Sequence, residues 1–175
     1  MTADTVTSLY PRLEPLLAQV TKPVQYTGGE VNSFSKDFAA AEVRWALMYP
    51  DAYEVGQPNQ GLAILYEILN ERDWMVAERT FSVWPDLAVK MREHGLPQFT
   101  LENHLPVKAF DLLGVSFSTE LGYTNLLEAL DLAGIPLHIR CFVASTARTV
   151  EELRAEHQAP TAKNAPVPPT KPAAG

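Results

Sequence analysis

The stretch that decides the fold is Arg44-Trp-Ala-Leu-Met-Tyr-Pro-Asp-Ala-Tyr-Glu-Val-Gly-Gln-Pro-Asn-Gln-Gly-Leu-Ala-Ile-Leu-Tyr-Glu-Ile-Leu-Asn70. Residues 43–49 are nearly continuous in apolar side chains and end at Pro50, which is typical of a strand buried on both faces of a parallel sheet. Apolar residues then recur at helical spacing, at Leu62, Leu65, Tyr66 and Leu69. Asn59 precedes them as a candidate N-cap. We therefore expect a strand, a glycine-bearing loop and a helix, the opening unit of a ligand-binding α/β domain.

The alternation of strands and helices continues along the chain. Residues 75–81 predict a second strand, and Pro85 opens a helix that ends near Gly95. Residues 111–117 predict another buried strand, and residues 99–101 and 137–143 predict shorter ones. A third helix follows residue 117 and ends at Gly134 and Pro136, and its apolar face is predicted from Tyr123, Leu126, Leu127 and Leu130. The fold class is therefore α/β: a Rossmann-like (flavodoxin-like), mainly parallel sheet flanked by helices.

Composition divides the chain into four parts. Residues 1–40 are expected to form an N-terminal helix, over 9–20, and an irregular arm. Residues 41–146 are expected to form the α/β domain, and residues 147–158 a short charged helix. Residues 159–175 are rich in Pro and Ala and are expected to be a disordered tail, because they cannot bury enough apolar surface to offset the entropy of ordering.

Charge and cysteine content exclude several classes of function. The 175-residue chain has a net charge of −7 and no basic block, which argues against nucleic-acid binding. No segment approaches the length of a membrane span and none resembles a signal peptide, so we expect a cytoplasmic protein without membrane contact. The single cysteine, Cys141, cannot form an internal disulfide or a thiolate metal site. The histidines show no metal-ligand spacing, so we expect no metal site.

Two loops are candidates for ligand binding, because carboxyl ends of parallel strands meet at one rim. The first loop, 50–59, offers Asp51, Tyr53, Glu54, Gly56 and Asn59. The second region offers Ser116, Ser118, Glu120, Tyr123 and Thr124. A structural alternative remains open for each loop: Asp51 and Asn59 cap turns, Gly56 supplies a positive φ and Tyr53 packs, while Ser118 or Thr119 caps the third helix. The chain contains no G-x-G-x-x-G, no P-loop and no G-x-S-x-G, so no catalytic residue is assigned.

Four segments together resemble one known domain: residues 22–32, 49–56, 78–86 and 119–136. Their order and spacing resemble the N-terminal cobalamin-binding-like domain of a family of radical S-adenosylmethionine (radical SAM) proteins, over roughly residues 10–137. In that family a barrel follows, and its C-x-x-x-C-x-x-C motif holds the iron–sulfur cluster that cleaves S-adenosyl-L-methionine. That motif is absent here, so the resemblance implies no iron–sulfur cluster in this chain. The D-x-H-x-x-G motif is also absent, so any cobalamin would bind without a protein histidine ligand.

The resemblance implies an isolated or truncated cobalamin-binding-like domain, with a sheet that is incomplete beyond Pro136. We expect it to act as a cofactor-binding or docking module without catalytic activity of its own. Its partner would be a radical SAM core domain or chain, or a second copy of itself. Two alternatives remain open: a small α/β enzyme that acts on a small molecule at the two loops, and an inactive fragment. A closed pocket joining Asp51 to Glu120 would favour the enzyme.

Overall fold

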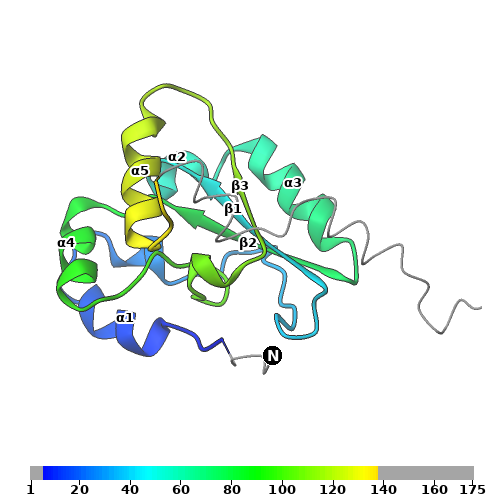
Figure 1. The fold of residues 1–175 in the computed structure, drawn as a ribbon, viewed down its shortest axis with the longest axis horizontal. Helices are drawn as coiled ribbons and strands as arrows, with labels where there is room; N and C mark the ends of the chain where they lie inside the picture. The colour runs from blue at the N-terminus through cyan, green and yellow to red at the C-terminus, as the bar shows by residue number, and fades with distance from the viewer. Residues whose placement is uncertain (1–5, 138–175) are drawn as a thin grey trace, which may run out of the picture.

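The structure is a computed structural model that describes residues 6–137. Its centre is a parallel sheet of three strands in the order β2-β1-β3, with β1 at Val43–Tyr49, β2 at Met75–Phe81 and β3 at Leu112–Val115 (Figure 1). The first two strands have the predicted bounds, whereas β3 is shorter than the predicted 111–117. Residues 99–101 form no strand; Phe99 makes an isolated antiparallel bridge to Pro106. The α/β class and the parallel sheet are confirmed.

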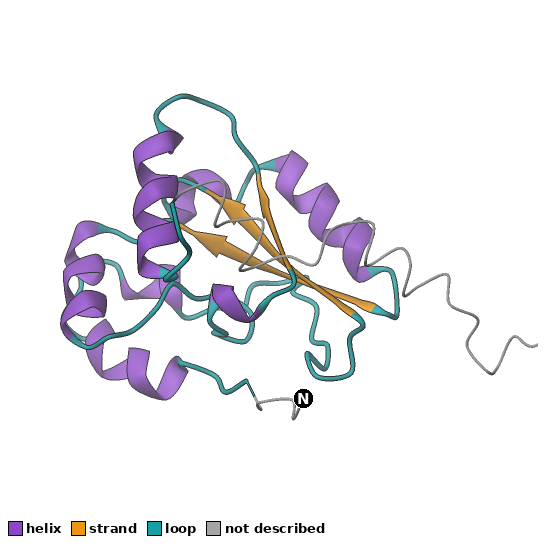
Figure 2. Ribbon diagram, in the orientation of Figure 1, coloured by secondary structure: helices purple, strands orange, loops and turns teal. Residues whose placement is uncertain are grey.

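Helices cover both faces of the sheet (Figure 2). The short α2 (Tyr53–Gly56) and α3 (Gln60–Asn70) lie on one face, where Leu62 and Tyr66 pack with Leu47 and Tyr49 of β1. The other face is covered by α5 (Gly122–Leu132) and the 3-10 helix η2 (Val107–Ala109), which pack with Ala46. Alternate residues of β1 point to opposite faces, and both faces are covered, which is why this strand is apolar apart from Arg44 near its start.

The N-terminal segment packs on the same domain. The predicted helix is confirmed as α1 (Tyr10–Leu17), with Leu13, Leu16 and Leu17 buried. It shares a core cluster with α4 (Pro85–Glu93), which begins at Pro85 as predicted. A second 3-10 helix, η1 (Pro23–Tyr26), opens an extended segment, residues 22–36, that we call the arm.

Two predicted helix faces are wrong in part. In α3, Asn59 is the predicted N-cap, and its Oδ1 accepts a hydrogen bond from the Leu62 N–H at 2.9 Å. Leu65, however, is exposed. In α5, Tyr123 and Leu127 are exposed, and the buried side is formed by Ala129, Leu130 and Leu132. The buried residues belong to the C-terminal half of α5: Leu130 packs with Ala46 of β1, and Leu132 packs with the cluster that α1 and α4 share.

The start of α5 also differs from prediction. Its N-cap is Leu121, which makes no side-chain cap, so neither Ser118 nor Thr119 caps the helix. Its end agrees with the sequence, since Gly134 has a φ of 63° and stops the helix. The predictions for residues 138–143, 147–158 and 159–175, and those for Cys141, His138 and His157, lie outside the described residues. Within residues 6–137, no helix has the length and apolar character needed to cross a membrane.

Replacing Gly56 by Ala should destabilise the fold by about 1–3 kcal/mol, because overpacking a buried contact displaces its neighbours. A Cβ at this position would lie 2.5 Å from Cδ1 of the Phe81 ring. Gly61→Ala is the matched control: its Cβ would meet only the Asn59 Oδ1, at 3.3 Å, and helix propensity favours Ala there by up to about 1 kcal/mol. Chemical denaturation of both variants checks this, and equal stabilities would contradict it.

Candidate functional site

The loops that follow β1 and β3 meet, as the sequence predicts. The Asn125 side-chain amide of α5 donates a hydrogen bond to the Pro50 carbonyl at 3.1 Å. β2 and β3 lie on opposite sides of β1, so the direction in which the sheet grows reverses between β1 and β3. In open α/β sheets, ligands bind at the carboxyl ends of the strands beside such a reversal. We call this edge, formed by residues 50–59 and 116–124, the rim.

The side chains of the first loop are largely engaged within the protein. Asp51 caps its own turn, since its Oδ1 accepts from the Ala52 N–H at 2.7 Å. Glu54 accepts hydrogen bonds from Lys22 Nζ at 2.5 Å and from Gln25 Nε2 at 2.6 Å, both in the arm. The bond from Lys22 is the main reason why the pKa of Glu54 lies below its ordinary value. Asn59 caps α3. Asp51, Glu54 and Asn59 therefore stabilise the loop and the segments beside it.

Tyr53 and Gly56 have packing roles in the first loop. The Tyr53 ring meets the Phe81 ring edge to face, with centroids 5.6 Å apart. Burial and the neighbouring Glu30 raise the pKa of the Tyr53 hydroxyl. The expectation of a positive φ at Gly56 is wrong, because this residue lies inside α2 and has no left-handed φ. It is glycine because the Phe81 and Tyr49 rings leave no room for a Cβ.

The predicted residues of the second region are mostly exposed. Ser116 is half-buried, and its N–H donates to the Met48 carbonyl at 2.8 Å. Four further candidates point to solvent: Ser118, Glu120, Tyr123 and Thr124. The Tyr123 ring packs against Phe117, with ring centroids 4.6 Å apart. In the half of the rim after β1 the side chains are therefore bonded or packed within the protein, whereas the half after β3 is exposed.

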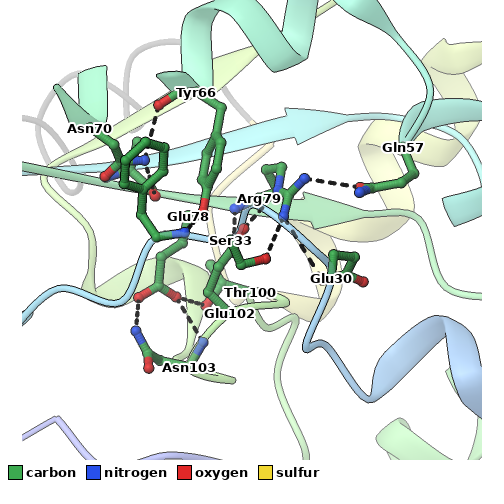
Figure 3. Close-up of polar contacts among 12 residues, drawn as sticks. Glu30, Ser33, Gln57, Tyr66, Asn70, Glu78, Arg79, Thr100, Glu102 and Asn103 are labelled. Carbon is green, nitrogen blue, oxygen red and sulfur yellow. Dashed lines mark hydrogen bonds and ion pairs between the residues drawn. The ribbon is translucent and has the colours of Figure 1, made fainter. Parts of the chain in front are cut away.

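Sequence reasoning missed a buried polar cluster on β2 (Figure 3). The Arg79 side chain is 9% exposed, and its Nε donates to Glu102 Oε1 at 2.7 Å. The Arg79 backbone N–H donates to the other oxygen of the same carboxylate, also at 2.7 Å. The guanidinium also donates to Gln57 Oε1 at 3.2 Å and to Ser33 Oγ at 3.1 Å. Its remaining neighbours are the Tyr66 ring, 4.3 Å from the guanidinium carbon, and Glu30, 3.8 Å from Nη2.

The preceding residue, Glu78, is 1% exposed and fixes the loop that covers β2. Thr100 Oγ1 donates to its carboxylate at 2.5 Å, and Asn103 Nδ2 donates at 2.6 Å. Glu78 and Arg79 thus hold the 99–105 segment against the outer edge of β2. The signal in the sequence is two adjacent charges, Glu78 and Arg79, inside a predicted buried strand, which tolerates them only when each charge is paired or hydrogen-bonded.

Burial raises the pKa of Glu102 to about 7, although the Arg79 charge and its hydrogen bonds lower it. For Arg79, burial alone would lower the pKa, but Glu102 raises it above its ordinary value. The guanidinium is therefore charged at every working pH, while the carboxylate takes up a proton more readily than an exposed glutamate does.

A cavity of about 680 Å³ opens beside Arg79, lined by residues 31–34 of the arm, by Gln57, and by Ala63, Tyr66 and Glu67 of α3. Its volume lies in the range of small-molecule sites, about 300–1,000 Å³. Two further cavities are described, and none of the three is lined by Asp51 or Glu120. The closed pocket that would favour an enzyme acting at both loops is therefore not among them.

Residues 6–137 contain no group of three or more His, Cys, Asp or Glu side chains placed to hold a metal ion. The two histidines in this range lie away from the rim. His104 is buried, and its Nε2 lies 2.8 Å from the Tyr26 carbonyl, while His94 follows α4. The rim, residues 50–59 and 116–124, contains no histidine.

Comparison with known proteins gives one finding. A family model described as radical SAM proteins, N-terminal, matches residues 61–141. The chain is thus similar, from α3 onward, to the N-terminal region of radical SAM proteins. No curated protein and no solved structure gave a significant match.

Glu102→Gln should change how stability depends on pH. The pKa of Glu102 is raised from 4.5 to about 7 by folding, so its contribution to stability is full below about pH 4.5 and is lost as the pH rises through 7. The wild type should therefore lose up to about 3 kcal/mol relative to the variant between pH 4 and pH 8. Denaturant unfolding of both proteins across this range measures the difference, and a difference that does not change with pH would contradict the raised pKa.

Proposed function

We propose that this chain is an accessory domain that docks on a radical SAM core and performs no chemistry of its own. The observation that carries the proposal is an apolar surface at the exposed half of the rim. It is formed by Phe117, Leu121, Tyr123 and Leu127, which are 40%, 74%, 61% and 49% exposed. We call it the apolar rim surface.

The arrangement of these residues supports one contact area. The Phe117 and Tyr123 rings touch, and Leu127 lies one helical turn after Tyr123 on the same side of α5. Leu121 is the N-cap of that helix. Contiguous exposed apolar side chains with a polar border are typical of protein interaction sites. Ser118, Glu120 and Thr124 provide that border.

The family similarity supports the choice of partner in this proposal. All four residues of the apolar rim surface lie within 61–141, the range similar to the N-terminal region of radical SAM proteins. An N-terminal region that precedes a catalytic core has that core as its nearest candidate partner.

Leu121→Asp should weaken docking at least tenfold, because it places a charge in the centre of a desolvated apolar contact. The measurement is the dissociation constant for a separately produced radical SAM core domain carrying the C-x-x-x-C-x-x-C motif, by calorimetry or interferometry. Val89→Asp is the matched control, since Val89 is 54% exposed on α4 and lies outside the surface. Equal losses in the two variants, or no binding by the wild type, would refute the docking proposal.

Cobalamin binding is a second proposal for the same rim, motivated by the resemblance of residues 49–56 and 119–136 to a cobalamin-binding-like domain. The corrin would lie against the exposed residues after β3 without a histidine ligand. Titration with cobalamin should then shift the visible absorbance of the cofactor and raise the Tm of the chain. Absence of both changes at saturating cobalamin would refute this proposal and leave docking to be decided by the Leu121 experiment.

A further inference from the structure

A second cavity, of about 10 Å³, lies at the carboxyl end of β2, between the arm and the sheet. Its lining includes Gln25 of η1, Thr80 and Phe81 of β2, and Gln98 and Phe99 of the segment after α4. A single water molecule needs about 10–15 Å³ of space measured in this way. The cavity therefore has room for one water molecule and for no larger ligand.

The orientation of the Gln98 amide is fixed by its neighbours. Its Nε2 donates to Phe81 O at 2.8 Å and to Thr80 Oγ1 at 2.9 Å. The Phe81 carbonyl can only accept. The Thr80 hydroxyl already donates its hydrogen to Phe99 O at 2.7 Å, so it too can only accept from Gln98. Turning the amide would bring its oxygen against two acceptors. Gln98 Oε1 is consequently left buried and without a hydrogen-bond donor among the described residues.

The Gln25 amide is fixed in the same way. Its Nε2 donates to Glu54 Oε1 at 2.6 Å. The pKa of Glu54 is lowered, so this carboxylate is ionised near neutral pH and can only accept. Gln25 Oε1 is therefore also buried, and residues 6–137 supply no donor to it. Gln25 and Gln98 are only 3% and 2% exposed, so solvent at the surface does not satisfy these oxygens.

The geometry points to one internal water molecule in this cavity that donates its two hydrogens to Gln25 Oε1 and Gln98 Oε1. A buried amide oxygen without a donor destabilises the fold, and one water satisfies both. A metal cation fits poorly, since oxygen-liganded cations take about six oxygens, no carboxylate lines this cavity, and its lining includes the apolar side chains of Val83, Phe99 and Leu101.

The bridging water joins the arm to the sheet. Gln25 lies in η1, whereas Gln98 is anchored on β2 through Thr80 and Phe81. Glu54 of α2 is held by the same Gln25 side chain. The water therefore belongs to a chain of contacts that runs from β2 through the arm to the first loop of the rim. This inference is independent of the docking proposal.

A high-resolution crystal structure of the full chain tests the inference directly. The expected result is one density peak within about 2.5–3.0 Å of both Gln25 Oε1 and Gln98 Oε1, with both amides oriented as described. An empty cavity, a peak bonded to only one of the two oxygens, or amides that bond each other directly would each overturn it.

A double-variant cycle tests it in solution. Gln25→Met and Gln98→Met each remove the whole amide, the Oε1 acceptor together with the Nε2 donor, with little change in volume, and each should lower the Tm. The two Nε2 donors have separate partners, so the losses of their hydrogen bonds add. Because one water serves both oxygens, the loss in the double variant should be smaller than the sum of the two single losses. Gln19→Met combined with Gln98→Met is the control, since Gln19 is exposed, does not line this cavity and accepts a hydrogen bond from Lys90 Nζ. Additive losses in the first pair would overturn the bridge. If a Gln→Met variant fails to fold, the crystal structure decides.

Discussion

The buried ion pair between Arg79 and Glu102 is the interaction on which the rest of this structure depends. The N–H groups of a guanidinium inside a strand must be hydrogen-bonded, or its burial destabilises the fold. Here the partners come from separate parts of the chain: Glu30 and Ser33 in the arm, Gln57 before α3, and Glu102 after α4. One charge therefore fixes the positions of three connecting segments.

The same pair closes the outer edge of β2. An uncovered edge strand presents unpaired backbone groups that invite pairing with other chains. Here the 99–105 segment covers that edge without forming a strand: the Leu101 N–H donates to the Arg79 carbonyl at 2.7 Å, and Glu78 binds Thr100 and Asn103. Side-chain hydrogen bonds from β2 thus take the place of the backbone hydrogen bonds that a neighbouring strand would make. This explains why Glu78 and Arg79 are charged and yet buried.

The sequence predicted the parts of the fold that depend on local patterns. β1 and β2 have the predicted bounds because each is a short run rich in apolar side chains. Asn59 caps α3 with its side-chain oxygen, and Pro85 is the first residue of α4. The predicted apolar faces of α3 and α5 were wrong at Leu65, Tyr123 and Leu127, which are exposed, because periodicity identifies an apolar side but not how much of it a neighbour covers.

The polar cluster could not be predicted for a different reason. The hydrogen-bond partners of Arg79 lie 22, 23 and 46 residues away in the sequence. No spacing rule connects them, since they meet only after the sheet and the arm are in place. The resemblance did place Glu30 and Arg79 in two of its four segments, but it assigned no role to either. The rim was predictable because parallel strands bring their carboxyl ends to one edge whatever the loops contain.

The arm explains why the rim is bonded within the protein after β1 and exposed after β3. Lys22 and Gln25 hold Glu54, and Tyr53 packs on Phe81, so the loop after β1 is stabilised from within. After β3 no arm residue approaches in the described contacts, and apolar side chains remain at the surface. Burial of apolar area is not directional, so it can supply affinity to a docked partner but cannot by itself set its orientation. In the proposed complex that orientation must come from the polar border, Ser118, Glu120 and Thr124, whose hydrogen bonds have fixed geometry. The residues that the sequence suggested as ligand contacts would then determine the orientation of a protein partner.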